Sequence, residues 1–247
     1  MPNGGRGSTR IRQLRLAFGA LPEGTRIAIN YVRTAYDTRY SNNGSILIDA
    51  TWRAYAWSGD VSFLRAQLPR ARRAMLFLNE HLRGRKQGLI DNSWFVGHDG
   101  EEGMHPGHSV PTAYWDLMPQ GRYDVDACLA YWQALGAMAH LERSATRLGI
   151  RVEPVSVVGP DGQSNLAYSC TAAELEALAQ RVRARIEEVF WNPDTGRFGR
   201  SIDAAGHLKD CGFLHANLML LACGLGTEAQ RHSILSWVDG SRLVPGD

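Results

Sequence analysis

The chain has 247 residues, of which 44% are hydrophobic and 21% are charged, and its formal net charge is +2. This composition is typical of a globular protein and excludes an intrinsically disordered chain. One local basic cluster, Arg70, Arg72 and Arg73, has no aromatic residues interleaved with it. We interpret it as the solvated face of a helix and expect no nucleic-acid partner.

The N-terminal residues argue against a signal peptide, because Arg12 and Arg15 interrupt the apolar positions around them. No apolar run approaches the ~18 residues that a membrane span needs, so we expect no membrane partner. The four cysteines show no CxxC spacing and are interpreted as buried free thiols: Cys128, Cys170, Cys211 and Cys223. Together these features predict a cytoplasmic protein.

Two regions differ in hydrophobic period. Residues 1–44 are predicted to form a short β-rich segment, since turn residues flank β-like runs such as 26–32. Residues 45–247 are predicted to form a domain of helical hairpins. Its first helix, 45–58, has little polar face, so we expect it to be buried on most sides.

Residues that typically begin or end helices divide the next stretch, 60–84, into two predicted helices. Asp60 is predicted to cap a short helical turn over 61–67, and Pro69 suits the first position of the following helix. That helix has one apolar stripe, and Gly84 is predicted to end it. The pattern therefore predicts an amphipathic helix directly after the buried one.

The same alternation recurs twice. The helix predicted over 124–148 has two apolar stripes, and an amphipathic helix follows it from a capping box at Thr171. The stretch 213–223 is nearly all apolar, and an amphipathic helix again follows from a capping box at Thr227. Inner helices sheathed by outer helices need this alternation, whereas a simple bundle has single-stripe helices. The predicted fold is mainly α: an (α/α) barrel, or an incomplete α/α toroid, with a small β segment at the N-terminus.

The long connection before residue 124 gathers aromatic, acidic, histidine and glycine residues, a composition typical of functional loops. Its histidines and carboxylates are suitable metal ligands. His105 and His108 are separated by Pro106 and Gly107, however, so they do not share a helix face, and no H-E-x-x-H motif occurs. We therefore predict no metal and no cofactor, and a metal-dependent hydrolase using residues 98–108 is only a third hypothesis.

The motif Tyr114-Trp115-Asp116, followed by Asp124-Val125-Asp126-Ala127, resembles the six-hairpin (α/α)6 glycosidases. These include trehalases, glucosidases acting on α-linked oligosaccharides, and glycogen-debranching and α-rhamnosidase-like enzymes. In trehalase-like members an aromatic-Trp-Asp turn carries the general acid, and Asp-x-Asn-Ala opens the next inner helix. The resemblance implies that Asp116 is the acid and that Asp124 opens the helix, while Asp126 stands where those relatives have Asn.

The resemblance further implies inverting hydrolysis of α-linked oligosaccharides, which needs a second carboxylate ~6.5–9.5 Å from the acid. Asp99 is our candidate, and Asp37, Glu101 and Glu102 are the alternatives. Aromatic faces that stack on sugar rings and polar groups that orient them complete such a site. The residues expected to bind substrate are Trp94, Phe95, His98, Tyr114, Trp115 and Asp124.

The number of helices departs from the family pattern. A six-hairpin barrel needs twelve helices, and the periodicity predicts about half of them. Inner-helix surface then stays open, so the barrel closes differently, pairs with a second copy as a homodimer across its open side, or is a fragment. The alternative function is accordingly a non-catalytic carbohydrate-binding or self-assembling truncated barrel.

Overall fold

The computed structural model divides into two units, Met1–Thr34 and Ala35–Asp247. In the first unit only a turn is described, in which the Thr25 amide donates to the Pro22 carbonyl at 3.2 Å. The β-like run 26–32 lies outside the described residues. The structure describes residues 20, 22–25, 41–92, 96–98, 104–106, 121–203 and 205–245, with backbone alone at 96–98 and 104–106.

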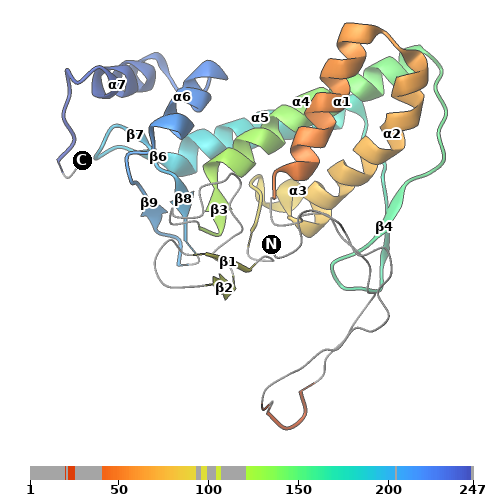
Figure 1. Cartoon of the computed structure of the whole chain (residues 1–247), viewed down its shortest axis with the longest axis horizontal. Coiled ribbons are helices and arrows are strands. Elements are labelled where there is room, and N and C mark those ends of the chain that lie inside the picture. Colours follow the sequence, from red (N-terminus) through yellow and green to blue (C-terminus); the bar gives the residue numbers. More distant parts are fainter. Residues whose placement is uncertain are drawn as a thin grey trace, which may run out of the picture. The chain divides into compact units, whose positions relative to one another are not determined.

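The described part of the second unit is mainly helical, which confirms the predicted fold class (Figure 1). Its helices are α1 (Asn43–Ser58), α2 (Val61–Leu76), the π-helical turn η1 (Phe77–His81), α3 (Gly84–Gln87), α4 (Val125–Arg147), α5 (Ala172–Phe190), α6 (Leu214–Ala222) and α7 (Glu228–Val238). Among these helices none is both long enough and apolar enough to cross a membrane.

The strands are short and antiparallel. They are β1 (Val96–His98), β2 (Met104–Pro106), β3 (Tyr123–Asp124), β4 (Ser156–Val158), β5 (Asn165–Ala167), β6 (Trp191–Asn192), β7 (Arg197–Phe198), β8 (Ser201–Ile202) and β9 (Leu208–Lys209). Pairs β1-β2, β4-β5 and β6-β7 form two-stranded ladders, and β3-β8-β9 form a three-stranded sheet. This sheet matters most here, because β3 leads directly into α4.

Helix α4 is the centre of the helical packing, in contact with α1, α2, α5 and α6 (Figure 1). Its buried residues form the two neighbouring stripes that the sequence predicts, with Cys128, Leu135 and Ala139 on one and Tyr131 and Met138 on the other. All five have exposures of 1% or less. A helix covered on two sides needs such a pattern, so the prediction for this segment is confirmed.

Three predicted caps are confirmed. The Asp60 carboxylate accepts from the amides of Ser62 and Phe63 at 2.8 and 3.0 Å. Thr171 and Thr227 each form a complete capping box: the side chain accepts from the amide three residues later, and the threonine amide donates to the side chain of that same residue. These bonds satisfy amides that would otherwise lack partners in the first helical turn.

The predicted boundaries around Pro69 and Gly84 are wrong. Pro69 lies inside α2, because the buried stripe of Leu64, Leu68 and Met75 continues past it and offsets the lost backbone bond. The π turn ends at Leu82, the left-handed residue that follows is Arg83 with φ of 55°, and Gly84 begins α3. A Cβ at Gly84 would come within 2.6 Å of the Tyr131 ring, so close packing on α4 explains this glycine.

Helix α1 is less buried than expected. Ser45, Ile48, Thr51 and Tyr55 face the core, whereas Trp57 is 94% exposed. The reason is that α2, α4 and the η1 turn contact only one side of α1 among the described elements. Low polarity predicted burial here, but no described neighbour covers the second side.

Candidate active site

Most of the predicted site residues lie outside the described residues, and their roles stay predictions: Trp94, Phe95, Asp99, Tyr114, Trp115 and Asp116. For His98 only the backbone is described, paired with Met104 in the β1-β2 ladder. Asp124 is fully described, and the candidate site is built outward from it.

Asp124 forms the corner between β3 and α4. Its backbone is extended, with φ of −115° and ψ of 131°, and its Oδ1 accepts from the Ala127 amide at 3.1 Å. The side chain is completely buried. Asp124 therefore opens α4, and its carboxylate sits where the amides and dipole of the helix N-terminus stabilise negative charge.

Arg200 supplies the positive charge at this corner. Its Nη1 lies 2.7 Å from Asp124 Oδ2 and 3.2 Å from Asp126 Oδ2, and its side chain has no exposed surface. Backbone bonds fix its position, because its carbonyl accepts from the Val125 amide and its amide donates to the Lys209 carbonyl. One buried guanidinium thus lies between two carboxylates, an arrangement that is stable only with close pairing.

Asp126 is the outer carboxylate of this cluster. Its side chain is 15% exposed, while that of Asp124 is 0% exposed. Burial raises the pKa of Asp126 to about 6, the Asp124 charge adds to the rise, and Arg200 and His215 oppose it. A carboxyl group with this pKa and some exposure can exchange a proton near neutral pH, which is the property of a general acid or base.

Asn92 lies beside the segment that leads into α4. A bridge pairs Asp91 with Tyr123, and the Asn92 amide donates to the Arg122 carbonyl at 2.8 Å. This register sets the Asn92 backbone opposite Arg122, two residues before Asp124. Asn92 is 0% exposed, and within the described part of the chain neither polar atom of its side chain has a hydrogen-bond partner. Such a buried amide is suited to bind a hydroxyl group of a ligand.

The same bridge ties together the two ends of the long connection. Asp91 precedes it, Arg122 follows it, and the guanidinium binds the buried carboxylate through Nη2 at 2.8 Å and Nε at 3.2 Å. Arg83 adds a longer contact of 3.4 Å to Asp91. The connection that carries Asp99 and Asp116 therefore leaves and re-enters the described structure beside the start of α4.

Sequence reasoning did not select Asn92, Asp126 or Arg200 as site residues. A signal existed for Asp126, since an Asp-x-Asp pair at a helix start forces two carboxylates into one turn. No local pattern marks Arg200, because it reaches Asp124 only through the pairing of β3 with β8. Among the described residues no group of three or more His, Cys, Asp and Glu side chains could hold a metal ion.

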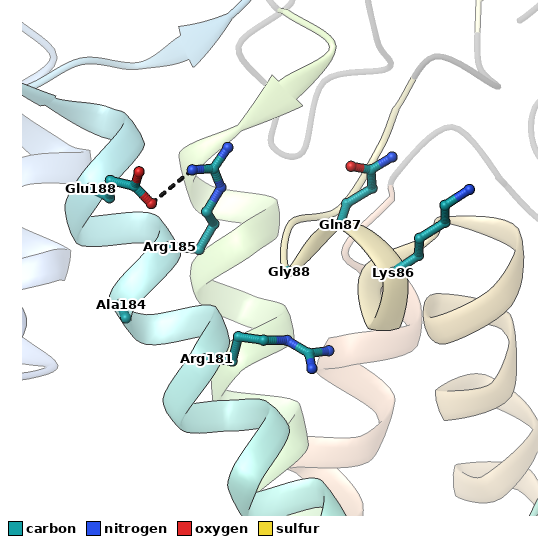
Figure 2. A pocket seen from close by; sticks show the side chains of 7 residues that line it. All are labelled: Lys86, Gln87, Gly88, Arg181, Ala184, Arg185 and Glu188. Atoms are coloured by element: carbon teal, nitrogen blue, oxygen red, sulfur yellow. Dashed lines mark hydrogen bonds and ion pairs between the residues drawn. The ribbon is translucent and has the colours of Figure 1, made fainter.

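An open groove of about 250 Å³ lies between α3 and α5 (Figure 2). It is lined by Lys86, Gln87, Gly88, Arg181, Ala184, Arg185 and Glu188. The acidic residue of this set, Glu188, pairs with Arg185 at 2.7 Å. The groove shares no residue with the Asp124 cluster and offers no second carboxylate, so it is a poor candidate for acid–base chemistry.

No family model matches the chain, and no curated protein matches it in sequence. Its fold is similar to that of a GH78 family rhamnosidase of Bacillus sp. GL1, with a TM-score of 0.55 and 17% sequence identity. The match covers 82% of this chain and 18% of that chain. At this identity the likeness concerns the fold alone, and it agrees with the mainly helical fold class that the sequence predicts.

Proposed function

We propose that this chain is a glycoside hydrolase domain that cleaves α-linked oligosaccharides with inversion. Asp126 acts as the base that activates water, and Asp116 protonates the leaving oxygen. The observation that carries the proposal is the Asp126 carboxyl group, held beside Asp124 and Arg200 with a pKa of about 6. The likeness in fold to a rhamnosidase supports the choice of glycoside chemistry.

The chemistry requires two carboxyl groups on opposite sides of the sugar. At neutral pH Asp126 is mostly ionised, and its raised pKa makes it a stronger base than an ordinary aspartate. Arg200 and the Asp124 cap hold it in place. Asp126 therefore supplies the second carboxylate, for which Asp99 was the candidate from sequence.

The substrate would lie between the start of α4 and the connection that carries Asp116. Support comes from the ties between Asp91, Asn92 and Arg122, which bring both ends of this connection to the β3 strand. The buried side chain of Asn92 has two N–H donors and one carbonyl acceptor that would be available to sugar hydroxyl groups. The aromatic residues predicted for ring stacking, such as Trp94 and Trp115, belong to the same connection.

The test is hydrolysis of a panel of α-linked disaccharides and aryl glycosides, including an aryl rhamnoside, by the wild type and three variants. Asp126→Asn removes the base, Asp116→Asn removes the acid, and Asp194→Asn changes an exposed aspartate in the β6-β7 turn as the matched control. We expect both site variants to lose at least about 100-fold in kcat/KM, the usual minimum for loss of an acid–base group. The control should keep full activity.

The pH profile separates the two roles. Ionised Asp126 is the active form, so wild-type kcat/KM should fall as the pH drops below about 6. Full activity of a folded Asp126→Asn variant would exclude Asp126 as the base. A folded wild type that binds sugars but hydrolyses none of the panel would instead support the non-catalytic, carbohydrate-binding alternative.

A further inference from the structure

Helix α1 has an unusually apolar outer side. Its core-facing side carries Ser45 and Thr51 beside the apolar Ile48 and Tyr55. Its outer side is largely apolar and includes Ile46, Leu47 and Trp57, which are 54%, 41% and 94% exposed. A surface helix in water normally has a polar outer side, so the outer side of α1 has the character of an interface.

The outer residues recur at helical spacing and form one continuous face, which we call the α1 face. It consists of Asn43, Ile46, Leu47, Ala50, Arg53, Ala54 and Trp57. The spacing of seven from Asn43 to Ala50 and from Ala50 to Trp57 is that of helices packed at a small crossing angle. A second helix can therefore lie along the whole α1 face.

We propose that the α1 face binds the same face of a second copy of this chain, with the two helices antiparallel and the two-fold axis beside Ala50. This assembly is independent of the glycosidase proposal. It uses α1 of each copy, and a C2 interface of this kind is made of one patch that is complementary to itself.

The order of large and small residues supports this pairing. A two-fold axis at Ala50 sets the two Ala50 residues against each other, which lets the helices approach closely. It also sets Ile46 of one copy opposite Ala54 of the other, and Trp57 opposite Asn43 and Gly44. Ile46 and Trp57 then each meet a smaller partner, and Leu47 lies opposite the aliphatic stem of Arg53.

Arg53 on the α1 face and Asp49 at its edge fit the same arrangement. Arg53 and Asp49 form an ion pair within each copy, with Nε 2.6 Å from Oδ2 and with 70% and 29% of the two side chains exposed. In the antiparallel pair, Arg53 of one copy lies within about one helical turn of Asp49 of the other. Opposite charges therefore meet on both sides of the two-fold axis, whereas a parallel pair would place like charges at the same height.

A second exposed apolar surface exists on α6, formed by Leu214, Leu218 and Met219. It spans a helix of only nine residues. Its residues show no comparable symmetry about a central small residue. We therefore assign self-association to the α1 face, and association through α6 is an alternative outcome of the experiment.

The first experiment is sedimentation velocity of the full chain across a range of concentrations. We expect the wild type to reach about twice its monomer mass of 27.3 kDa at high micromolar concentration. Ala50→Glu places two carboxylates at the axis and should keep the protein monomeric. Ala66→Glu, at an exposed position of α2, is the matched control and should dimerise like the wild type.

A cysteine pair tests the geometry. With Ala50 on the two-fold axis, Ala50→Cys should give a covalent dimer under mild oxidation in much higher yield than Ala66→Cys, while the native cysteines give the same background in both. A wild type that stays monomeric, or a dimer that Ala50→Glu leaves intact, would overturn the proposal. Association abolished only by Leu218→Glu would move the interface to α6.

Discussion

Helices α4 and α1 have similarly apolar sequences but different surroundings. In α4 the residues of both apolar stripes are buried, and helices lie on either side of it. In α1 only one side is buried, and Ile46, Leu47 and Trp57 remain exposed. The N-terminus of α4 also has a side-chain cap from Asp124, whereas in α1 the Asn42 side chain makes no cap bond.

The difference shows what an apolar pattern determines and what it does not. Periodicity identifies which side chains gain free energy by leaving water, about 25 cal/mol for each Å² of apolar surface removed. It does not identify which neighbour covers them. For α4 the neighbours belong to the described chain, and for the outer side of α1 we infer a second copy.

The largest effect is expected at the buried start of α4. Arg200→Met removes the guanidinium and leaves the Asp124 carboxylate buried without its cation. We expect a loss of about 3–5 kcal/mol in the free energy of unfolding, measured by urea denaturation. Arg143→Met, which breaks an exposed ion pair with Glu176, is the control and should cost less than about 1 kcal/mol. Equal costs for both variants would show that burial does not strengthen the Arg200 cluster.

Substituting one leucine in each helix compares the contributions of α4 and α1 to stability directly. Leu135 in α4 is 0% exposed and Leu47 in α1 is 41% exposed. At concentrations where the chain is monomeric, Leu135→Ala should lower the free energy of unfolding by about 3 kcal/mol, because it leaves a cavity. Leu47→Ala should cost less than about 1 kcal/mol, since water already reaches the side chain. Similar losses would mean that the exposed side of α1 is covered within a single chain.

Local signals predicted the parts of the fold that depend on neighbouring residues. The caps at Asp60, Thr171 and Thr227 and the two stripes of α4 follow from contacts within one helix or from the period of one helix. The Pro69 boundary failed because tertiary packing of α2 outweighs the local cost of proline. The prediction that α1 is buried on most sides was wrong, because burial depends on a neighbouring element, and the sequence of α1 does not show which element packs against it.

The candidate site was predictable only in part. Asp124 could be placed at the start of a helix from its position before an apolar stripe. Its partner Arg200 could not be identified, because the two meet through the β3-β8 ladder between distant segments. The raised pKa of Asp126 comes from burial and from the Asp124 charge, and Arg200 opposes the rise, so sequence could indicate the paired carboxylates but not their chemistry.

The smallest of these effects concerns a charge at the start of α4. The pKa of Asp126 is raised from 3.8 to about 6, so the folded protein holds a proton that the unfolded chain releases between these values. Wild-type stability should therefore fall as the pH rises from about 4 to 6 and stay lower above it. The Asp126→Asn variant has no carboxyl group at this position, so its stability should not show this pH dependence.

We expect Asp126→Asn to be more stable than the wild type at pH 7, by about 2 kcal/mol, and equal to it near pH 4. Urea denaturation at both pH values measures the difference. Asp194→Asn, at an exposed position of the β6-β7 turn, is the control and should change stability by less than about 0.5 kcal/mol. If the gain of Asp126→Asn were the same at pH 4 and pH 7, the ionised carboxylate would not be the source of strain in the Arg200 cluster.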